Sequence, residues 1–313
     1  MLLVTDAVTA QDLTRPPLFE PSLVIEGYSV GQAAAENDQD LSLAGGGIKT
    51  GLTVPLPMRI RHDSSLPIAL PFISLMASGS STELAPGTTY DLAGGSMAGG
   101  VALASAAGNV YILSGGLGFT AETNHLGSAK PHGIGLLLGT ARTSPSFALI
   151  YGAAFTTSLG RPLPLPLFGF RWRLSSIADA KLILPAAARV GFRLGSRAAM
   201  DCSIGLAGEY GQISSSAAGA SDADSQQLLD IGISRAYAAL GLALKLTDDL
   251  VIEARGGTVA SSRFLIMDGA AKLTDESFGP APFAAVTIRY LLGNPVDPLI
   301  ANNSASNGED DDE

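Results

Sequence analysis

The sequence predicts an all-β protein, a transmembrane up-and-down antiparallel β-barrel of about twelve strands within a range of about ten to fourteen. The first observation is a period of two, in which Phe168, Phe170 and Trp172 alternate with Gly169 and Arg171. Side chains alternate between the two faces of a strand, so this segment has one apolar face and one polar face. Even positions are apolar further along the chain too, at Val190, Phe192, Leu194, Met200, Cys202, Ile204, Leu206 and Tyr210.

The second observation is what occupies the opposite face. Full charges and glycines lie at the centres of these strands, as at Arg189, Gly191 and Asp201. A polar lumen with the apolar face turned towards lipid accommodates this pattern. The alternative is a soluble β-barrel or sandwich in which the aromatic side chains face a core.

The third observation is the composition. Charged residues make up only 15% of the chain, whereas about 25% is usual in soluble domains. The 37 glycines suit strand bends and tight turns. A formal net charge of -10 argues against a nucleic-acid partner, because neutralising phosphates requires clustered Lys and Arg. The single Cys202 falls on an apolar face and is interpreted as a small apolar side chain.

The strand candidates follow one another at hairpin spacing. Pro55 and Pro57 cannot donate to a ladder, so an edge, a bulge or an irregularity is expected there. The apolar parity changes from odd around Ile231 to even at Leu240, which predicts a bulge or turn near Ser234 and Arg235. The predicted strands are Leu23–Val30, Ile48–Ile60, Leu66–Met76, Tyr90–Ala107, Val110–Glu122, Gly133–Arg142, Phe147–Ser158, Phe168–Leu174, Val190–Leu194, Met200–Tyr210, Leu229–Ser234, Leu240–Leu246, Leu250–Gly256 and Ala284–Tyr290.

A membrane-spanning helix is the alternative for Leu92–Ala121, which carries no charge and exceeds the about 20 residues that such a helix needs. However, Gly108 and Asn109 form a two-residue hairpin signal, and Tyr111, Leu113, Leu117 and Phe119 then share one parity. A hairpin is therefore predicted.

Three segments are expected along the chain. Residues 1–20 are predicted to be a residual signal-peptide or lead-in segment, because Val8, Thr9 and Ala10 resemble a small-residue cleavage site. An ordinary disordered N-terminus is the alternative. Residues 21–293 are predicted to form the barrel. Residues 294–313 carry several acidic residues and no basic residue, which predicts an acidic disordered tail.

Four motifs resemble an uncharacterised family of bacterial outer-membrane β-barrel proteins. They are residues 161–173 (Arg-Pro-Leu-Pro-Leu-Pro-Leu-Phe-Gly-Phe-Arg-Trp-Arg), 182–194 (Leu-Ile-Leu-Pro-Ala-Ala-Ala-Arg-Val-Gly-Phe-Arg-Leu), 254–257 (Ala-Arg-Gly-Gly) and 263–269 (Arg-Phe-Leu-Ile-Met-Asp-Gly). The resemblance implies a location in the outer membrane of a Gram-negative bacterium, with the lipid bilayer as a partner. It implies no reaction and no substrate.

The charged residues on the polar face of the predicted strands are the candidate lumen or ligand residues. One hypothesis is a constriction that attracts small anionic solutes, because a guanidinium suits carboxylate or phosphate ligands. The other is an ion-paired interior, because buried charges are tolerated only when they are paired. The candidates are Arg171, Arg173, Arg189, Arg193, Asp201, Glu209, Glu253 and Arg255, and Arg59, Asp230, Lys245 and Arg289 share their parity.

The sequence predicts no enzymatic activity, no cofactor and no metal site. It contains no G-x-S-x-G nucleophile elbow. His125 and His132 fall in a predicted loop without a ligand set at metal-binding spacing. Three functions remain open: a narrow porin-like channel for small anionic solutes, a closed structural or anchoring barrel, and a soluble β-barrel or sandwich.

Overall fold

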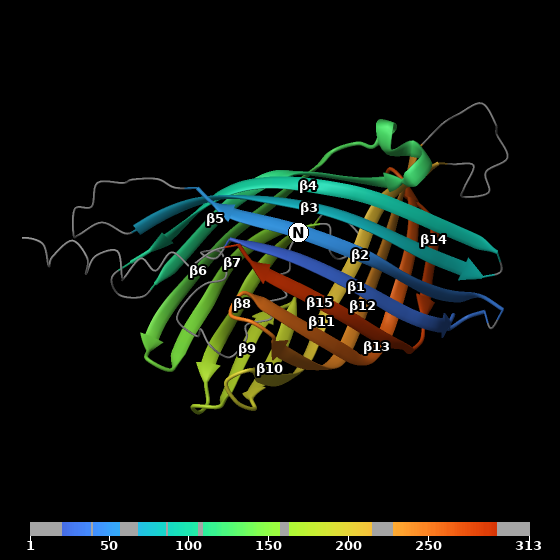
Figure 1. Ribbon diagram of the computed structural model, residues 1–313. Coiled ribbons are helices and arrows are strands. Elements are labelled where there is room, and N and C mark those ends of the chain that lie inside the picture. The colour runs from blue at the N-terminus through green and yellow to red at the C-terminus, as the bar shows by residue number, and fades with distance from the viewer. Residues whose placement is uncertain are drawn as a thin grey trace, which may run out of the picture.

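The chain folds into a closed antiparallel β-barrel (Figure 1). The computed structural model describes residues 21–38, 40–56, 68–85, 87–105, 109–156, 163–214 and 228–292. Strands β1 to β13 pair in sequence order, and β15 closes the ring by pairing with both β13 and β1. This ring of 14 strands confirms the predicted fold class, at the upper end of the predicted range.

The strands are β1 (Ser22–Ala34), β2 (Ser42–Pro55), β3 (Ile68–Ala85), β4 (Thr88–Ala104), β5 (Val110–Glu122), β6 (His132–Ser144), β7 (Phe147–Thr156), β8 (Leu163–Arg173), β9 (Ala178–Leu184), β10 (Ala187–Arg193), β11 (Ala198–Ser214), β12 (Leu228–Lys245), β13 (Leu250–Asp268), β14 (Ala271–Phe278) and β15 (Ala281–Leu291). A short 3-10 helix, η2 (Thr123–Ser128), joins β5 to β6. No helix within the described ranges is long and apolar enough to cross a membrane. The predicted lead-in (1–20) and the predicted acidic tail (294–313) lie outside the described residues.

The outside of the barrel is apolar. Phe168, Trp172, Phe192 and Ile204 are all exposed on this face, and Cys202 lies exposed between them. The opposite parity is covered, since Asp201 retains only 1% of its exposure. Phe168, Trp172 and Phe192 therefore face outwards rather than into a core, which contradicts the soluble alternative and is the arrangement of a membrane-spanning barrel. Strands β4 and β5 pair along their length, so Leu92–Ala121 is the predicted hairpin.

The lipid-facing assignment leads to a first prediction. Phe168 lies at the middle of β8 and is 62% exposed, so Phe168→Arg should lower the free energy of unfolding by about 2–4 kcal/mol, because it places a charge near the bilayer midplane. The measurement is denaturant unfolding in lipid vesicles. Leu194→Arg, just beyond the end of β10, is the control and should change stability by only about 0–1 kcal/mol. Equal losses at both positions would contradict the assignment.

The two ends of the barrel differ. We call the end that holds Ser22 and Leu291 the terminal end, and the opposite end the loop end. Strands β8 and β9, β10 and β11, and β12 and β13 are joined at the terminal end by short turns. At the turn after β12, Lys245 donates a 2.9 Å hydrogen bond to Asp248, which lowers the pKa of the Asp248 carboxyl below its ordinary value.

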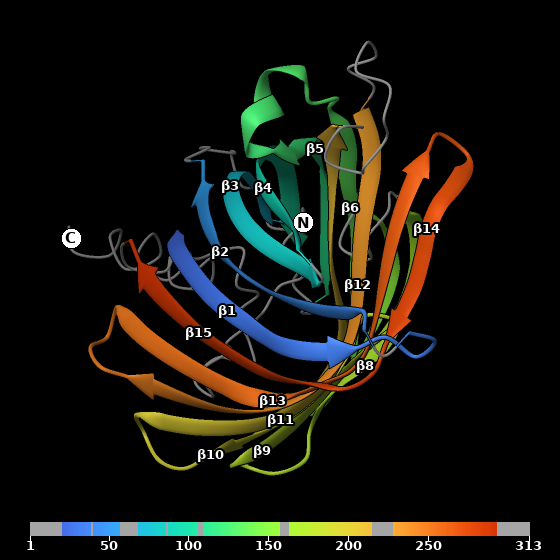
Figure 2. The same ribbon diagram turned by 90° about the vertical axis from the view of Figure 1, so that its right-hand side faces the viewer.

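The hairpin of β13 and β14 extends the wall at the loop end (Figure 2). Strand β13 pairs first with β15 and then with β14. Arg263 makes two hydrogen bonds to Asp275, at 2.6 and 2.7 Å, and Lys272 lies 2.8 Å from the same carboxylate. The pair of Arg263 and Asp275 joins the two arms of the hairpin, whereas Lys272 and Asp275 both belong to β14.

The ring becomes smaller towards the loop end. Strand β6 pairs with β5 only as far as Gly118, and β10 pairs with β11 only as far as Gly205. Beyond these points β5 meets β11 directly, through a parallel bridge between Ala121 and Gln212. Strand β14 meets the end of β1 through a bridge between Phe278 and Ala35. The loop end is therefore enclosed by β1–β5 and β11–β14 alone, and β6–β10 widen the barrel only at its terminal end.

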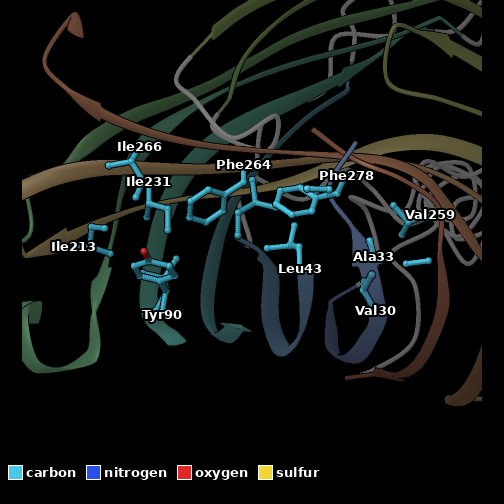
Figure 3. Packing of buried hydrophobic residues seen from close by; sticks show 14 of the residues in the cluster. Val30, Ala33, Leu43, Tyr90, Ile213, Ile231, Val259, Phe264, Ile266 and Phe278 are labelled. Atoms are coloured by element: carbon cyan, nitrogen blue, oxygen red, sulfur yellow. The ribbon is translucent and has the colours of Figure 1, made fainter. Parts of the chain in front are cut away.

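A buried apolar cluster, which we call the apolar plug, fills the smaller ring (Figure 3). Phe264 and Phe278 have no exposed surface, and the rings of Tyr90 and Phe264 lie 5.6 Å apart between centroids. The plug consists of Val30, Ala33, Ala35, Leu43, Tyr90, Leu92, Ile213, Leu229, Ile231, Ile233, Val259, Phe264, Ile266, Phe278 and Ala281. The described side chains thus close the loop end with apolar rather than polar groups.

The predicted bulge of β12 near Ser234 and Arg235 is wrong, and the apolar plug explains why the pattern suggested it. Strand β12 runs without interruption along β11 from Leu228 to Leu244. Its odd residues face inwards throughout, so Ile231 belongs to the plug while Leu240 faces outwards. The irregularity lies instead in the partner strand, where Ala236 pairs with Ser261 and Tyr237 with Val259. The apolar parity changes because the interior changes from apolar to polar, not because β12 bends.

Candidate functional site in the barrel lumen

Cations gather on the inner face near the terminal end. Arg173 and Arg193 are the last residues of β8 and β10, and Lys245 ends β12. Arg173 is in register with Gly191, so its Cα atom is separated from that of Arg193 by two strand spacings and two residues, about 12 Å. We call the inward cations of this level the basic arc: Arg171, Arg173, Lys181, Arg193, Lys245 and Arg289.

Two members of the basic arc have no polar partner among the described residues. The Nε atoms of Arg173 and Arg193 are buried and make no hydrogen bond. Asp179 lies directly opposite Arg173 in the pairing of β8 and β9, yet the two side chains form no ion pair in the described structure. No ion pair or hydrogen bond thus joins the guanidinium group of Arg173 or Arg193 to another described residue.

An ion-pair belt adjoins the basic arc, and its members are Arg189, Asp201, Glu253 and Arg255; Arg189 lies directly opposite Lys181 in the pairing of β9 and β10. Arg189 Nη2 lies 3.0 Å from Asp201 Oδ2 and 4.0 Å from Glu253 Oε1. Arg255 Nε donates to the same Glu253 oxygen. Both carboxylates are 1% exposed, so each guanidinium neutralises a charge that has lost its water.

A second buried pair lies above the belt, just below the apolar plug. Arg235 Nη1 lies 3.1 Å from Glu209 Oε1, and the hydroxyl of Tyr28 donates to the same oxygen. Lys49 lies over the Tyr28 ring, 5.0 Å from its centroid. The upper lumen is thus occupied by a buried pair of opposite charges, although Glu209 Oε2 and Arg235 Nε make no hydrogen bond.

The wall opposite the basic arc is apolar. Phe72, Ala102 and Ile112 form a buried cluster, against which Leu136 and Leu138 pack. Further round the barrel, Ile150, Ala154, Leu165 and Leu167 share the inward parity of β7 and β8. We call this the apolar wall: Leu70, Phe72, Ala102, Val110, Ile112, Leu136, Leu138, Ile150, Ala154, Leu165 and Leu167. The lumen therefore has one cationic side and one apolar side.

A cavity of about 150 Å³ lies inside the barrel below the plug. Charged groups line part of it, including Glu26, Lys49 and Arg255, and apolar groups such as Met76 and Phe283 line the rest. Its wall on β11 is the segment 206–209. A molecule in this space would meet both polar and apolar surfaces.

Two sequence-based placements are wrong. Asp230 lies on the outer face of β12, where Tyr210 donates a 2.9 Å hydrogen bond to its Oδ1. The sequence predicted a bulge near Ser234 and Arg235, before which even residues such as Asp230 would face the lumen. Strand β12 has no such bulge, so Asp230 faces outwards. His132 is the first residue of β6 rather than a loop residue, and its ring contacts Tyr210 edge-on with centroids 5.6 Å apart. Arg59 lies outside the described residues.

Sequence reasoning missed Arg235, Tyr28 and Lys181 as members of the lumen. Arg235 and Ile233 share odd parity, and an unbroken β12 would have placed both inside. Lys181 lies on β9, which the sequence did not predict because its alternation is between small and charged residues. Within the described ranges, no group of three or more His, Cys, Asp or Glu could hold a metal ion.

No protein-family model matches this sequence, and no curated protein matches it. Among solved structures, an outer-membrane channel of Pseudomonas putida F1 is 7% identical, with a TM-score of 0.45 over 90% of this chain and 98% of that chain. The toluene transporter TodX of Pseudomonas putida is 10% identical, with a TM-score of 0.31 over 86% and 89% of the two chains. The translocator domain of the autotransporter NalP of Neisseria meningitidis is 9% identical, with a TM-score of 0.35 over 86% and 88%. At these scores the functions of those proteins are not carried over to this chain.

Proposed function

We propose that the protein is an outer-membrane channel of a Gram-negative bacterium that takes small organic anions carrying an apolar group. The observation that supports this most strongly is the pair of guanidinium groups beside the terminal end, those of Arg173 and Arg193, whose Nε atoms have no hydrogen-bond partner in the described part of the chain. Short turns join the strands at this end, as at the periplasmic end of such barrels. The terminal end would then open towards the periplasm.

The two sides of the lumen suit the two ends of such a molecule. Same-sign charges within low-dielectric walls raise the local concentration of counter-ions. A guanidinium offers a planar fork of donors that matches a carboxylate, a sulfonate or a phosphate. The apolar wall faces this arc across the lumen and would remove the apolar part of the ligand from water.

The second candidate function is a closed structural or anchoring barrel. It is favoured by the apolar plug and by the pairing of the buried charges at mid-height. These features stabilise the barrel and leave the terminal end accessible. The proposal includes no enzymatic activity and no cofactor.

Charge selection provides the test. Proteoliposomes would be supplied with octanesulfonate or with octyltrimethylammonium, which match in chain length and differ in charge. We expect the anion to be preferred, and the variant Arg173→Gln/Arg193→Gln to reduce this preference by about tenfold, at the lower end of the effect of a focused field. The readout is the ratio of the two uptake rates.

The control variant is Arg263→Gln/Lys272→Gln, which removes two cations from the exposed hairpin at the loop end. It changes the net charge of the protein equally and should leave the ratio unaltered. Preference for the cation would contradict the proposed anion selectivity, and no uptake of either probe would favour the structural barrel.

A further inference from the structure

The wall of the barrel is interrupted between β8 and β11. The two strands between them, β9 and β10, are short, and their ladders end at Phe168 on β8 and at Gly205 on β11. Closer to the loop end, no strand in the described part of the chain pairs with residues 163–167 of β8 on that side. The same holds for residues 207–211 of β11, up to the bridge at Gln212, because the Leu206 N–H still donates to the Ala186 carbonyl. The His132 ring packs against Tyr210 near the end of this stretch.

Two prolines explain why the edge of β8 stays unpaired. The Arg173 N–H donates towards the β7 side, to the Ser146 carbonyl, and the Leu174 N–H donates towards the β9 side, to Ala178. Pairing with β7 is continuous from Leu163 to Trp172, so the even residues direct their nitrogens to the β9 side throughout. Pro164 and Pro166 therefore place nitrogens without hydrogen at the free edge, which cannot donate to another strand.

The rim of this interruption is apolar on its lower side, towards the terminal end, and polar on its upper side, towards the loop end. Phe168, Leu184 and Ile204, on the strands beneath it, are all more than half exposed on the outer face of the barrel. At the upper rim, Tyr210 and Gln212 both donate to Asp230, at 2.9 and 3.4 Å. The lower rim thus continues the lipid-facing band, and the upper rim carries groups suited to the polar interface.

The interior side of the interruption is partly apolar. The internal cavity is bounded by residues 206–209 of β11, which pair with β12 and, on their other side, with no described strand. Leu165 and Leu167 of the apolar wall face inwards from β8, across the interruption. The apolar plug closes the barrel axis at the loop end among the described residues.

We propose that this interruption is a side opening through which the alkyl part of an amphipathic anion moves between the lumen and the bilayer. It is bounded by residues 163–167, 207–211, Leu184 to Ala187, and the bridge between Ala121 and Gln212. An alkyl chain crossing there stays in apolar surroundings from the membrane to the apolar wall, so it is not exposed to water. The headgroup can remain near the polar upper rim. The proposal rests on the proposed function for its substrate class.

Labelling from the membrane tests the opening without any transport. A long-chain alkyl diazirine partitions into vesicles that hold the protein, is activated by light, and its sites of attachment are mapped by mass spectrometry. Outward-facing Phe192 should be labelled in any case. The side opening predicts that inward-facing Leu165 and Ala207 are labelled too, whereas Ile112, inward-facing on a continuous part of the wall, is not. Labelling confined to outward-facing residues would overturn the opening.

Blocking the side opening chemically tests whether the amphipathic anion passes through it. In a Cys202→Ser background, Gly208→Cys would be modified with a bulky maleimide, and Ile48→Cys on the outer face of β2 would be modified identically as the control. We expect octanesulfonate uptake to fall to the level of protein-free vesicles at position 208 and to be retained at position 48. Retained uptake at position 208 overturns the route. If the unmodified protein takes up no octanesulfonate, the proposed function fails, and the diazirine pattern alone then supports or overturns the opening.

Discussion

Phe264→Ala is expected to lower the free energy of unfolding by about 3–5 kcal/mol, the usual range for deleting a buried aromatic ring. Phe264 has no exposed surface and lies against Tyr90 inside the smaller ring of the loop end. Its own strand, β13, is held on both sides by ladders with β12 and β14, so the wall cannot close freely around the space left by the ring. The change should be measured by denaturant unfolding in lipid vesicles.

Combining Phe264→Ala with Phe278→Ala should also produce ion conductance along the barrel axis. Both rings are fully buried in the plug, and removing them together takes away the largest groups that close the axis. Planar-bilayer recordings would detect the new current. Leu273→Ala on the exposed hairpin is the control and should change stability by no more than about 0.5 kcal/mol. A stable, silent double variant would show that the plug neither supports nor closes the loop end.

The wall of the barrel was predictable because the face of a strand to which each side chain points is set locally. Alternation along Phe168, Arg171 and Trp172 depends only on the pleat of one strand, and the structure confirms it. Strand β9 escaped prediction because Ala178 and Ala180 give its outward face no apolar signal. The missing strand is one reason for the lower predicted count.

The plug was not predictable from the same pattern. Apolar residues of one parity look alike whether they face lipid or a buried core. Ile231 and Ile233 were therefore interpreted as evidence for a bulge, whereas they face inwards on a regular strand. Distinguishing the two cases requires knowing that β5 and β11 meet at the loop end, which is a contact distant in sequence.

The candidate site was predictable in composition and not in pairing. The alternation along each strand predicted that Arg189, Asp201 and Glu253 face inwards. Which of these side chains form ion pairs is decided by the register between strands. Arg193 shares the strand of Arg189, yet only Arg189 reaches the acids. Likewise, the prolines of residues 161–173 were apparent in the sequence. However, only the ladder with β7 shows to which neighbouring strand the backbone nitrogens of Pro164 and Pro166 point.

Arg189→Met is expected to destabilise the barrel by about 3–5 kcal/mol, because it leaves a buried carboxylate without its partner. Asp201 is 1% exposed, and Arg189 provides its 3.0 Å ion pair. Arg189→Met/Asp201→Leu should destabilise less than the single change, because no unpaired charge then remains at that position. Denaturant unfolding of all four combinations gives the coupling energy between the two side chains. Lys272→Met, at an exposed ion pair, is the control and should cost about 0–1 kcal/mol.

The same variants separate the two interpretations of the inward arginines. If the ion-pair belt is structural, Arg189→Met/Asp201→Leu should keep the anion preference of octanesulfonate uptake, because Arg173 and Arg193 still face the terminal end. If Arg189 instead binds the solute, the single and double variants should both lose this preference, with little difference in stability between them. The second outcome would contradict the division of the lumen into a belt that holds the wall and an arc that meets the anion.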